Sequence, residues 1–551
     1  MTKVIILGGG FGGVFTAKHL KKIAPPDTDI RLISENNYFT FQPLLPEVAA
    51  GAIGASDSVT PLRVLLPGVR TVMGEVRAID LARKNVDIVQ GSKRRIKTMT
   101  YDHLVLALGQ VVHLSRVPGL EEHAFPIKHS AHALRLRNHV INCLEYADSV
   151  DDPQIKARLL TFVVVGAGFS GVETVGEIKD MIDRSLKFYP NIAKADVRTV
   201  LVEFSDRILG ELPEKLANYA QERLARQGID VWLNTAVKSA SATTVEMADG
   251  RILTSSTVVA TIGNGPSPLI EALDIEKERG RLKVDRFMRI PGVDGAWAVG
   301  DAALIPLTDT PEGPRDYAPP TAQFAVREGQ QLAANVAAQI SGAPLKAFHY
   351  VPRGAMASIG NYRAVASTMG VQLHGVLAWL LWRTFYLGML PGAVTKLRVV
   401  LNWALDLFAP RNLGQVQEVK KPSAKYMRFS EGQEVFEPGM IPDGFYTIVS
   451  GSCRLEIPRD DGGAPYRRDL KVGDHFGERV LFRQQLRTGR VTALEDSRVL
   501  RVQRDDFWRL SSSFPMLEKY FKNYIAENFP EDLRPHVLGG TERDTKTPPK
   551  S

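Results

Sequence analysis

Cysteine is scarce in this chain: only Cys143 and Cys453 occur among 551 residues, and they lie far apart in the sequence. Without a CxxC pair, a thiol redox centre or a cysteine-based metal site has no support, and we expect the protein to contain no metal. Two distant cysteines also exclude a disulfide framework. This scarcity is typical of a protein that faces the cytosol.

Signals for nucleic-acid binding and for secretion are also missing. The sequence has no basic helix, no zinc-ligand spacing and no basic stretch interleaved with aromatic residues, so we predict that it binds no nucleic acid. A strand starts at about Val4, which leaves no room for a signal peptide. The net charge of +8 is modest for this length. It is compatible with contact to an anionic membrane surface.

The first glycine-rich stretch follows a short apolar run, Val4 to Leu7, and precedes a predicted helix. Its glycines fit the GxGxxG spacing at Gly8, Gly10 and Gly13. The first glycine permits a tight turn, the second lets a pyrophosphate approach the backbone, and the third lets helix and strand pack closely. Glu35 ends the next predicted strand, where a carboxylate would bind both ribose hydroxyls. We therefore predict a dinucleotide site at this loop.

A second unit of the same kind begins with the apolar run 162–165. Gly166, Gly168 and Gly171 again follow a strand and open a helix. Glu203 ends the next predicted strand, although its distance from the glycines is longer than the usual spacing of roughly 20 residues. An acid at this place repels the additional phosphate of NADPH, so NADH is the predicted nicotinamide cofactor.

The order of the two units indicates which dinucleotide each of them holds. Two such units in one chain suggest one bound flavin and one exchanging nicotinamide. In flavoproteins with two dinucleotide sites, a Gly-Asp after a late strand reaches the ribityl and pyrophosphate region of FAD, and Gly300-Asp301 fits that position. Residues 101–109 resemble the strand that closes the FAD domain before the NADH domain is inserted. The first loop is therefore predicted to bind FAD and the second NADH.

Two further segments favour one group of flavoproteins. A disulfide reductase needs paired cysteines beside the flavin, so that subclass is excluded. Residues 39–51 and 319–329 resemble segments of the type II NADH dehydrogenases, in which a Thr-Ala-Gln places a glutamine, here Gln323, at the isoalloxazine and the quinone entrance. Arg327 departs from a second glutamine that many members carry, which leaves quinone affinity or type open. The resemblance covers residues 1 to about 412.

This resemblance implies the identity of the site residues. In the family an acid on the helix after the second glycine loop faces the nicotinamide and flavin, and Glu173 and Glu177 stand four residues apart on one face of that helix. An alternative for Glu173 is that it caps or solvates the helix. No general base is required, because hydride passes directly from the nicotinamide to the flavin. The predicted catalytic residues are Glu177 and Gln323; the FAD residues are Gly8, Gly10, Phe11, Gly12, Gly13, Glu35, Val76, Gly109, Asp301, Thr321 and Ala322; the NADH residues are Gly166, Gly168, Phe169, Gly171, Glu173, Glu203 and Gly263; and the quinone residues are Pro43, Leu44, Gln323 and Arg327.

Apolar side chains are concentrated between residues 373 and 408. Leu373 to Leu387 is too short to span a bilayer, and Ala393 to Phe408 forms a second predicted helix after a Pro-Gly break. Basic residues and half of the six tryptophans of the chain lie here, which is typical of amphipathic helices in the membrane interface. A buried helical hairpin or a dimer interface is the alternative. The segment also resembles the membrane-binding helices of type II NADH dehydrogenases; its tryptophans are Trp379, Trp382 and Trp403.

Residues 424 to about 530 resemble the cyclic-nucleotide-binding fold. Short strand-like runs separated by turns predict an all-β barrel or jelly roll. In that family a glutamate accepts the ribose 2′-hydroxyl and an arginine clamps the cyclic phosphate, and nothing in the sequence separates cAMP from cGMP. The residues at these positions are Gly477, Glu478, Arg487 and Thr488. A degenerate domain that serves only assembly is the alternative, because three residues depart from the usual pattern: Arg479, Gly489 and Arg490.

Length, composition and motifs together predict the domain order. With 551 residues, 44% of them hydrophobic and 24% charged, the chain is globular and too long for one core. The predicted fold class is α/β, with two Rossmann-like domains, a short helical membrane anchor and a β-barrel or jelly-roll domain. The predicted parts are an FAD domain at 1–115 and 291–345, an NADH domain at 116–290, an oxidoreductase segment with the anchor helices at 346–411, a linker at 412–423, a cyclic-nucleotide-binding-like domain at 424–535 and a disordered tail at 536–551.

The sequence therefore predicts an FAD-dependent NADH:quinone oxidoreductase that pumps no protons. We expect a homodimer that lies as a monotopic protein on the cytoplasmic face of the cell membrane, with NADH and a lipid quinone as substrates and a cyclic nucleotide as a regulator. Two alternatives stay open. One is an NADH-dependent flavoprotein reductase with a soluble acceptor, and the other is a redox or nucleotide sensor whose turnover is incidental.

Overall fold

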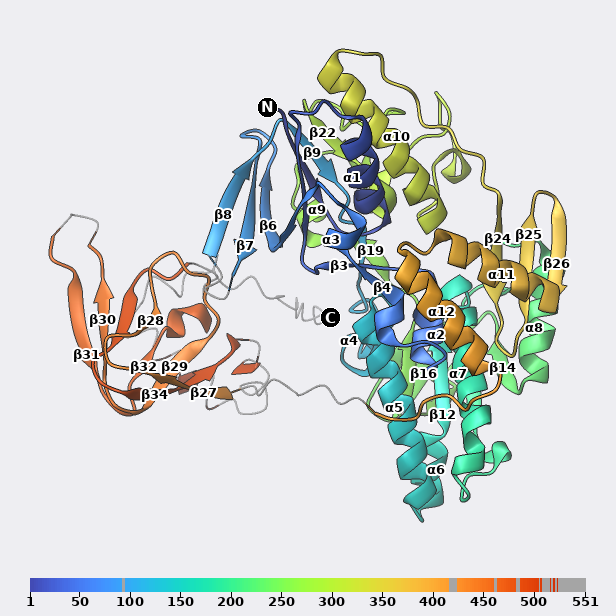
Figure 1. Cartoon of the computed structure of the whole chain (residues 1–551). Helices are drawn as coiled ribbons and strands as arrows, with labels where there is room; N and C mark the ends of the chain where they lie inside the picture. The colour runs from blue at the N-terminus through green and yellow to red at the C-terminus, as the bar shows by residue number, and fades with distance from the viewer. Residues whose placement is uncertain are drawn as a thin grey trace, which may run out of the picture. The chain divides into compact units, whose positions relative to one another are not determined.

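The computed structural model describes residues 1–91, 95–415, 424–459, 463–481 and 486–504, together with residues 506, 507, 516, 519, 520 and 523 (Figure 1). The chain divides into two compact units, one formed by Met1–Val86 and Met99–Gln417 and the other by Asp87–Thr98 and Glu418–Ser551. The predicted tail at 536–551 and most of the predicted linker lie outside the described residues.

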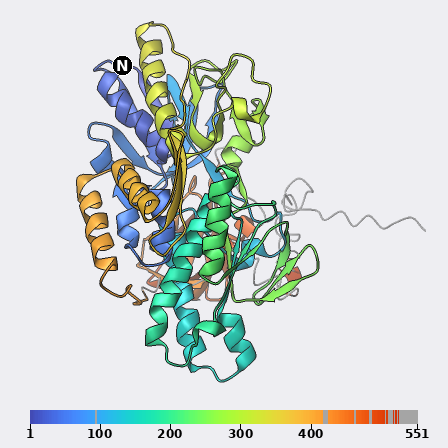
Figure 2. The ribbon, with the colours of Figure 1, turned by 90° about the vertical axis from the view of Figure 1, so that its right-hand side faces the viewer.

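The first sheet of the larger unit contains five parallel strands in the order β22-β9-β1-β2-β5. Its central strand β1 is buried from Val4 to Leu7, as expected for an apolar strand that is covered on both faces. Helices α1 and α10 pack against each other, and Figure 2 shows them side by side. The elements are β1 (Lys3–Leu7), α1 (Phe11–Ile23), β2 (Asp29–Ser34), β5 (Arg70–Met73), β9 (His103–Leu106), β22 (Ala296–Ala298) and α10 (Ala322–Ser341).

The second sheet is also parallel, in the order β11-β18-β12-β13-β14. All five residues of β12 are buried, and the apolar core on this sheet includes Val163 and Val200. In each sheet a glycine loop follows the carboxyl end of the central strand, β1 or β12. Ligands of open α/β sheets bind at such strand ends. The elements are β11 (Ala124–Pro126), α5 (Ser130–Ser149), α6 (Pro153–Leu159), β12 (Thr161–Val165), α7 (Phe169–Ser185), β13 (Arg198–Val202), α8 (Glu214–Arg226), β14 (Ile229–Trp232) and β18 (Thr257–Ala260).

Smaller strands and helices accompany these elements along the chain, and most of β7 and β8 belongs to the smaller unit. They form a two-stranded pair β3-β4, a three-stranded sheet β6-β7-β8, the pair β10-β19 and two further three-stranded sheets. Their bounds are β3 (Tyr38–Thr40), α2 (Leu45–Ala49), β4 (Val59–Pro61), α3 (Leu62–Leu65), β6 (Glu75–Asp80), β7 (Asn85–Gln90), β8 (Arg95–Thr100), β10 (Gln110–Val112), α4 (Leu120–His123), β15 (Val237–Ala240), β16 (Thr244–Met247), β17 (Ile252–Thr254), β19 (Asn264–Pro266), α9 (Pro268–Glu271), β20 (Lys277–Glu278), β21 (Arg281–Lys283) and β23 (Ala303–Leu304).

The larger unit ends with an antiparallel sheet and two helices. The predicted helix start at Leu373 is wrong, because Leu373 lies in β26 and pairs with Ala366 of β25. Short apolar runs do not distinguish a strand from a helix by pattern alone. Among the helices of the described residues, none is both long and apolar enough to cross a membrane. The elements are β24 (Gly354–Ser358), β25 (Ala364–Thr368), β26 (Val371–Gly375), α11 (Val376–Met389) and α12 (Ala393–Asp406).

The smaller unit contains two four-stranded antiparallel sheets, in the orders β27-β34-β29-β32 and β28-β33-β30-β31. Their inner faces share one apolar core that includes Phe436, Tyr446 and Phe476. This β-rich architecture agrees with the predicted barrel or jelly roll. The strands are β27 (Ala424–Phe429), β28 (Glu434–Phe436), β29 (Phe445–Ser450), β30 (Cys453–Ile457), β31 (Tyr466–Leu470), β32 (His475–Phe476), β33 (Arg490–Ala493) and β34 (Ser497–Val502).

Candidate functional site

A cavity of about 590 Å³ lies at the glycine loop that follows β1. The loop, the ends of neighbouring strands and the start of α10 form its wall. Most of the residues predicted to bind FAD therefore lie together, although they come from positions spread over more than 300 residues. Those that border the cavity are Gly8, Gly10, Phe11, Gly12, Glu35, Val76, Gly109, Asp301 and Ala322.

The glycines of this loop have different structural roles. Gly8 has a φ of +115°, and a Cβ there would lie 2.1 Å from the carbonyl oxygen of Ala107. A Cβ on Gly13 would lie 2.0 Å from the carbonyl oxygen of Gly8, so the third glycine permits close packing between helix and strand. Gly10 has no atom within 4 Å of such a Cβ. Open space beside Gly10 at the N-terminus of α1 fits the pyrophosphate of a dinucleotide.

Glu328 supports the Gly300-Asp301 turn, and the sequence reasoning missed it. Its Oε2 accepts a hydrogen bond of 2.9 Å from the backbone N–H of Gly300. Burial raises the pKa of Glu328 to about 8. Thr321 does not border the cavity but caps α10, since its Oγ1 accepts from the N–H of Phe324. The signal for Glu328 was its place on the same helix, five residues after the glutamine of the Thr-Ala-Gln motif.

Three basic side chains that the sequence reasoning also missed border the same cavity: Lys128, His129 and His132. Burial lowers the pKa of Lys128, and Asp301 opposes that shift. Burial, with the neighbouring His132 and Lys128, lowers the pKa of His129 to about 4. His129 is therefore neutral at pH 7. Gln42 donates a hydrogen bond of 3.3 Å to the carbonyl of Lys128, which connects this wall to the segment after β3.

The second glycine loop opens to solvent. A Cβ on Gly171 would lie 1.8 Å from the carbonyl oxygen of Gly166, whereas exposed Gly168 has open space around it. Phe169 is half-buried, and Gly263 has a φ of +86°. None of the residues predicted to bind NADH borders the first cavity, so the two loops form separate sites.

Glu203 is held at the second loop by two backbone groups. Its carboxylate accepts hydrogen bonds of 2.5 Å from the N–H of Ala167 and 2.9 Å from the N–H of Ser205. The side chain is half-buried. A carboxylate at the end of β13 is compatible with the predicted preference for NADH, and the role of Glu203 in cofactor choice stays a prediction.

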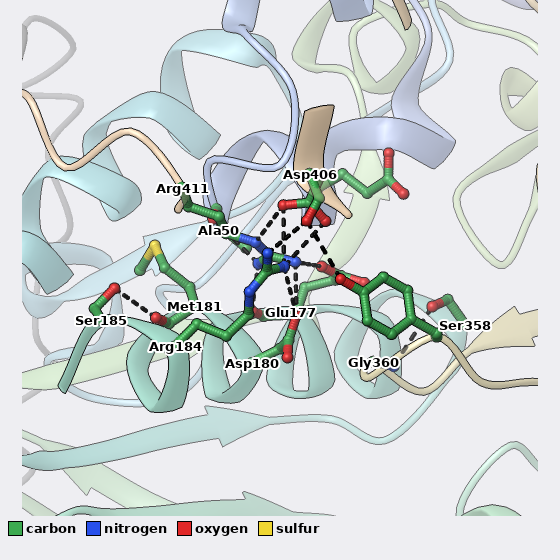
Figure 3. Close-up of polar contacts among 12 residues, drawn as sticks. Ala50, Glu177, Asp180, Met181, Arg184, Ser185, Ser358, Gly360, Asp406 and Arg411 are labelled. Carbon is green, nitrogen blue, oxygen red and sulfur yellow. Dashed lines mark hydrogen bonds and ion pairs between the residues drawn. The ribbon is translucent and has the colours of Figure 1, made fainter. Parts of the chain in front are cut away.

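Glu173 and Glu177 are buried in α7 and do not border the first cavity. Glu173 accepts hydrogen bonds from the N–H of Ser358 at 3.0 Å and from the indole N–H of Trp382 at 2.9 Å. Burial raises the pKa of Glu173 to about 8. Its exposure of 6% contradicts the alternative in which it caps or solvates the helix. Glu177 pairs with Arg411, as Figure 3 shows, at 3.0 Å.

In the smaller unit, the side chain of Arg487 is buried and bonds to neighbouring protein groups. Its guanidinium donates to the carbonyls of Gly477 and Gly444, contacts Asp443 at 3.4 Å and lies 4.1 Å from the centre of the Phe436 ring. Asp443 also accepts from Tyr446 and Arg501. Sequence reasoning missed this acid.

The other predicted nucleotide-binding residues of this unit lie in different environments. Glu478 is buried and its pKa is raised by burial, while Thr488 is exposed. Arg490, which departs from the usual pattern, pairs with Glu434 at 3.2 Å. Glu478 and Arg487 are therefore the two inward-facing charged members of the predicted set.

Comparison with known proteins covers nearly the whole described chain. Residues 2–329 match the pyridine nucleotide-disulphide oxidoreductase family, 353–412 the NDH2 C-terminal domain, and 426–514 the cyclic nucleotide-binding domain. The type II NADH:quinone oxidoreductase Ndh of Mycobacterium tuberculosis is 32% identical over 425 residues, which cover 74% of this chain and 89% of that protein. The chain belongs to the type II NADH:quinone oxidoreductase family. The predicted family is thus confirmed, as is the presence of a cyclic-nucleotide-binding domain.

Another relative agrees with this assignment, and a solved structure shares the fold. The internal alternative NAD(P)H-ubiquinone oxidoreductase A1 of Solanum tuberosum is 28% identical over 451 residues, covering 75% of this chain and 88% of its own. NDH2 from Plasmodium falciparum in complex with NADH has the same fold, with a TM-score of 0.68, 21% identity, and coverage of 75% of this chain and 99% of that one. This type II enzyme is therefore an NADH dehydrogenase of the flavoprotein oxidoreductase class.

The residues predicted to bind quinone in this type II enzyme do not border the described cavity. Pro43 is half-buried and Leu44 is buried in the short helical turn that begins at Gln42, which does border it. Gln323 is half-buried at the start of α10. The guanidinium of Arg327 lies 5.8 Å from the ring centre of Tyr350. Their role in binding quinone stays a prediction.

The tryptophans of α11 and α12 are buried, so their predicted position in the membrane interface is wrong. Trp382 donates to Glu173, and Trp403 donates to Glu47 at 2.7 Å. Indole N–H groups need partners when buried, and here acids of the core supply them. Other side chains of the two helices, and two that follow α12, form an exposed apolar surface: Val376, Leu377, Leu380, Val394, Leu397, Val400, Leu401, Leu405, Leu407 and Phe408.

The position of Glu203 leads to a prediction about cofactor choice in this type II enzyme. Replacing Glu203 with glutamine should narrow the preference for NADH over NADPH by about 1–3 kcal/mol in kcat/KM, because the negative charge that repels the ribose phosphate is lost. Glu246→Gln, on the surface strand β16, removes the same charge elsewhere and should leave the preference unchanged. Equal kcat/KM for both cofactors in the unmodified enzyme would contradict the assignment of Glu203.

Proposed function

We propose that this type II enzyme binds FAD at the first glycine loop and NADH at the second, and that it passes electrons to a lipid quinone at a membrane surface. The observation that carries the proposal is the open cradle beside Gly10 in a cavity that Glu35 and Asp301 border. These are the backbone and carboxylate groups that a dinucleotide needs at its pyrophosphate and ribose. FAD, when bound, supplies the two-electron acceptor between NADH and the quinone.

The residues of the chain would bind and orient the dinucleotide. Gly10 leaves space for the pyrophosphate, and Glu35 accepts from the ribose hydroxyls. Lys128, His129 and His132 border the same cavity, and burial lowers the pKa of each of them. Protein groups of this kind set orientation and local charge, while the cofactor supplies the chemistry.

The exposed apolar surface of α11 and α12 supports a membrane-facing position for this site. Phe408 is 90% exposed and Leu377 70% exposed, and Lys396 and Arg398 lie on the same helix as several of the leucines. Apolar helices with basic residues bind in the headgroup region of anionic bilayers. Membrane association brings the enzyme to its lipid quinone. The cytoplasmic face and the homodimer stay predictions.

Turnover with different acceptors tests the function. We expect NADH oxidation with a long-chain quinone in liposomes to exceed oxidation with ferredoxin or oxygen by at least about tenfold in kcat/KM, because the membrane concentrates the quinone at the enzyme. Extraction of the purified protein should yield non-covalent FAD. A preference for ferredoxin or oxygen would favour a reductase with a soluble acceptor, and FMN in the extract would contradict the assignment of Glu35.

We further propose that the smaller unit binds a cyclic nucleotide. Support comes from the family match over residues 426–514 and from the inward-facing Glu478 and Arg487. An arginine in a buried setting recognises a cyclic phosphate through a charge-assisted bidentate contact. A ligand alters NADH:quinone turnover only through different affinities for two states of the enzyme, and such coupling is commonly about 1–3 kcal/mol.

Replacing Arg487 with leucine should remove nucleotide binding. The phosphate would lose its buried counter-charge, at a cost of about 3–5 kcal/mol. Folding should survive, because Asp443 keeps Arg501 at 2.9 Å and Tyr446 at 2.7 Å as partners. Calorimetry of the full chain with cAMP and cGMP measures the loss. Arg490→Leu, at an exposed position at the start of strand β33, is the matched control. If neither nucleotide gives binding heat or a thermal shift with the unmodified chain, the smaller unit is a degenerate domain that serves only assembly.

A further inference from the structure

Arg411 is the most extensively bonded side chain of the larger unit that the proposed chemistry leaves unused. All five of its N–H donors have acceptors: Nε reaches Asp406 at 3.2 Å, Nη1 reaches the carbonyls of Ala50 and Glu177 at 3.2 Å each, and Nη2 reaches Glu177 at 3.0 Å and Asp180 at 2.8 Å. The side chain is only 3% exposed. Figure 3 shows the guanidinium between α7 and the end of α12.

The surroundings of Glu177 explain why this arginine matters. Burial raises the pKa of Glu177 to about 7, and Arg411 exerts the largest opposing influence. Arg184 cannot replace it, because Arg184 pairs with Asp406 at 3.1 Å and lies 3.6 Å from Asp180. The titratable and charged groups around Glu177 are Glu173, Asp180 and Arg184 on α7, Glu47 on α2, Arg383 and Tyr386 on α11, Asp406 on α12, and Arg411 itself.

Arg411 also marks the place where the chain leaves the larger unit. Residues 416–423, which lead to the smaller unit, follow almost at once. The next residues are held from a second helix, since Arg137 of α5 donates to the carbonyls of Asn412 and Gly414. Helix α5 starts directly after Lys128 and His129, two residues of the cavity wall. The segment 411–414 is therefore bonded both to the helix of the second glycine loop and to a helix that starts at the first cavity.

We propose that Arg411 is a positioning residue that fixes the protonation state of Glu177 and, through the segment 411–414, makes that state depend on how the chain to the smaller unit is held. This proposal rests on the proposed function only for its activity measurement. If the segment 411–414 moves, the guanidinium of Arg411 moves away from the carboxylates of Glu177, Asp180 and Asp406. Less positive charge then offsets these acids, so the protonated form of Glu177 is favoured.

The test uses the full chain with its bound flavin and three variants. Arg411→Met removes the charge, Arg411→Lys keeps the charge but loses two of five donors, and Arg226→Met is the control. Arg226 pairs with Glu222 on the surface of α8, where both side chains are 66% exposed. The measurements are the pH dependence of NADH:quinone turnover and amide hydrogen exchange in α7 and at 411–415.

Arg411→Met should move the limb of the pH profile near neutrality upward by about one unit or more, because Glu177 loses its main counter-charge. The direction is the same whether turnover needs the protonated or the ionised form. Arg411→Lys should restore most of the profile, and both variants should speed exchange at 411–415 by at least about tenfold. A merely structural arginine would alter thermal stability and leave the pH profile of the folded enzyme unmoved, and that result would overturn the proposal.

If Arg411→Met does not fold, Arg137→Met carries the test. It keeps every residue of the ion cluster but releases the carbonyls of Asn412 and Gly414, so the segment that carries Arg411 is held less firmly. Exchange at 411–415 should therefore rise, and the pH limb should move upward by about half a unit. No change in either measurement would overturn the proposal. Absence of quinone turnover in the unmodified chain would instead count against the proposed function, and the exchange data would still decide the role of Arg411.

Discussion

Replacing Gly10 with valine is expected to give a folded enzyme that contains almost no FAD. No protein atom lies within 4 Å of a Cβ at Gly10, so the side chain fits the empty loop. The same volume is where the proposed pyrophosphate approaches the backbone. We expect FAD affinity to fall at least about 100-fold, or about 2.7 kcal/mol. The measurement is the ratio of extracted FAD to protein, with circular dichroism and thermal unfolding to verify the fold.

Gly13→Val is the matched comparison in the same loop. Its Cβ would lie 2.0 Å from the carbonyl oxygen of Gly8, so the loop itself must shift and the free energy of unfolding should fall by about 3 kcal/mol or more. Gly10→Val should therefore lose FAD and keep its fold, whereas Gly13→Val should lose both FAD and stability. Full FAD content in Gly10→Val would place the dinucleotide elsewhere and contradict the assignment of the first loop.

Replacing Leu377, Leu397, Leu401 and Leu405 with glutamine should abolish binding to liposomes. These leucines are between 54% and 70% exposed. If each contributes about 1 kcal/mol in the interface, the four together contribute about 4 kcal/mol, or roughly a 1000-fold change in affinity. Reduction of a long-chain quinone should fall with liposome binding, while NADH oxidation with ferricyanide should persist because the dinucleotide sites are untouched.

The control variant carries glutamine at four exposed apolar positions elsewhere on the larger unit: Ile23, Val64, Ile252 and Val351. This variant should bind liposomes as the unmodified enzyme does. If the leucine variant still binds liposomes but changes its oligomeric state, the surface of α11 and α12 joins two copies of the chain. The tryptophans are unsuitable for this test, because Trp382 and Trp403 bond to buried acids and their loss would damage the core.

The dinucleotide loops could be predicted from the sequence because their determinants are local. A strand, a glycine turn and a helix follow one another within a few residues, and positive φ or close packing at Gly8 and Gly13 requires glycine. Glu35 and Glu203 each follow the end of the next strand, although Glu203 lies farther from its glycines than is usual. The same logic led to Glu478 and Arg487, which lie nine residues apart in a family motif.

The membrane segment was predicted less well. Leu373 pairs with Ala366 in a sheet, although its apolar neighbours are equally compatible with a helix. The composition of α11 and α12 is also the same whether tryptophan faces lipid or protein. Only the fold places Glu173 and Glu47 where they accept from the indoles of Trp382 and Trp403.

The sequence by itself determined the family, the two dinucleotide loops and the presence of the C-terminal β-rich unit, because each rests on residues that act within short distances along the chain. Only the tertiary structure decided which side chains of α11 and α12 face outward, and that Glu328 supports the Gly300-Asp301 turn. It also decided the role of Arg411, whose most distant acceptor along the chain, the carbonyl of Ala50, lies 361 residues away. Burial of such a charge is tolerated only where several acceptors converge, and convergence of distant segments is a property of the fold.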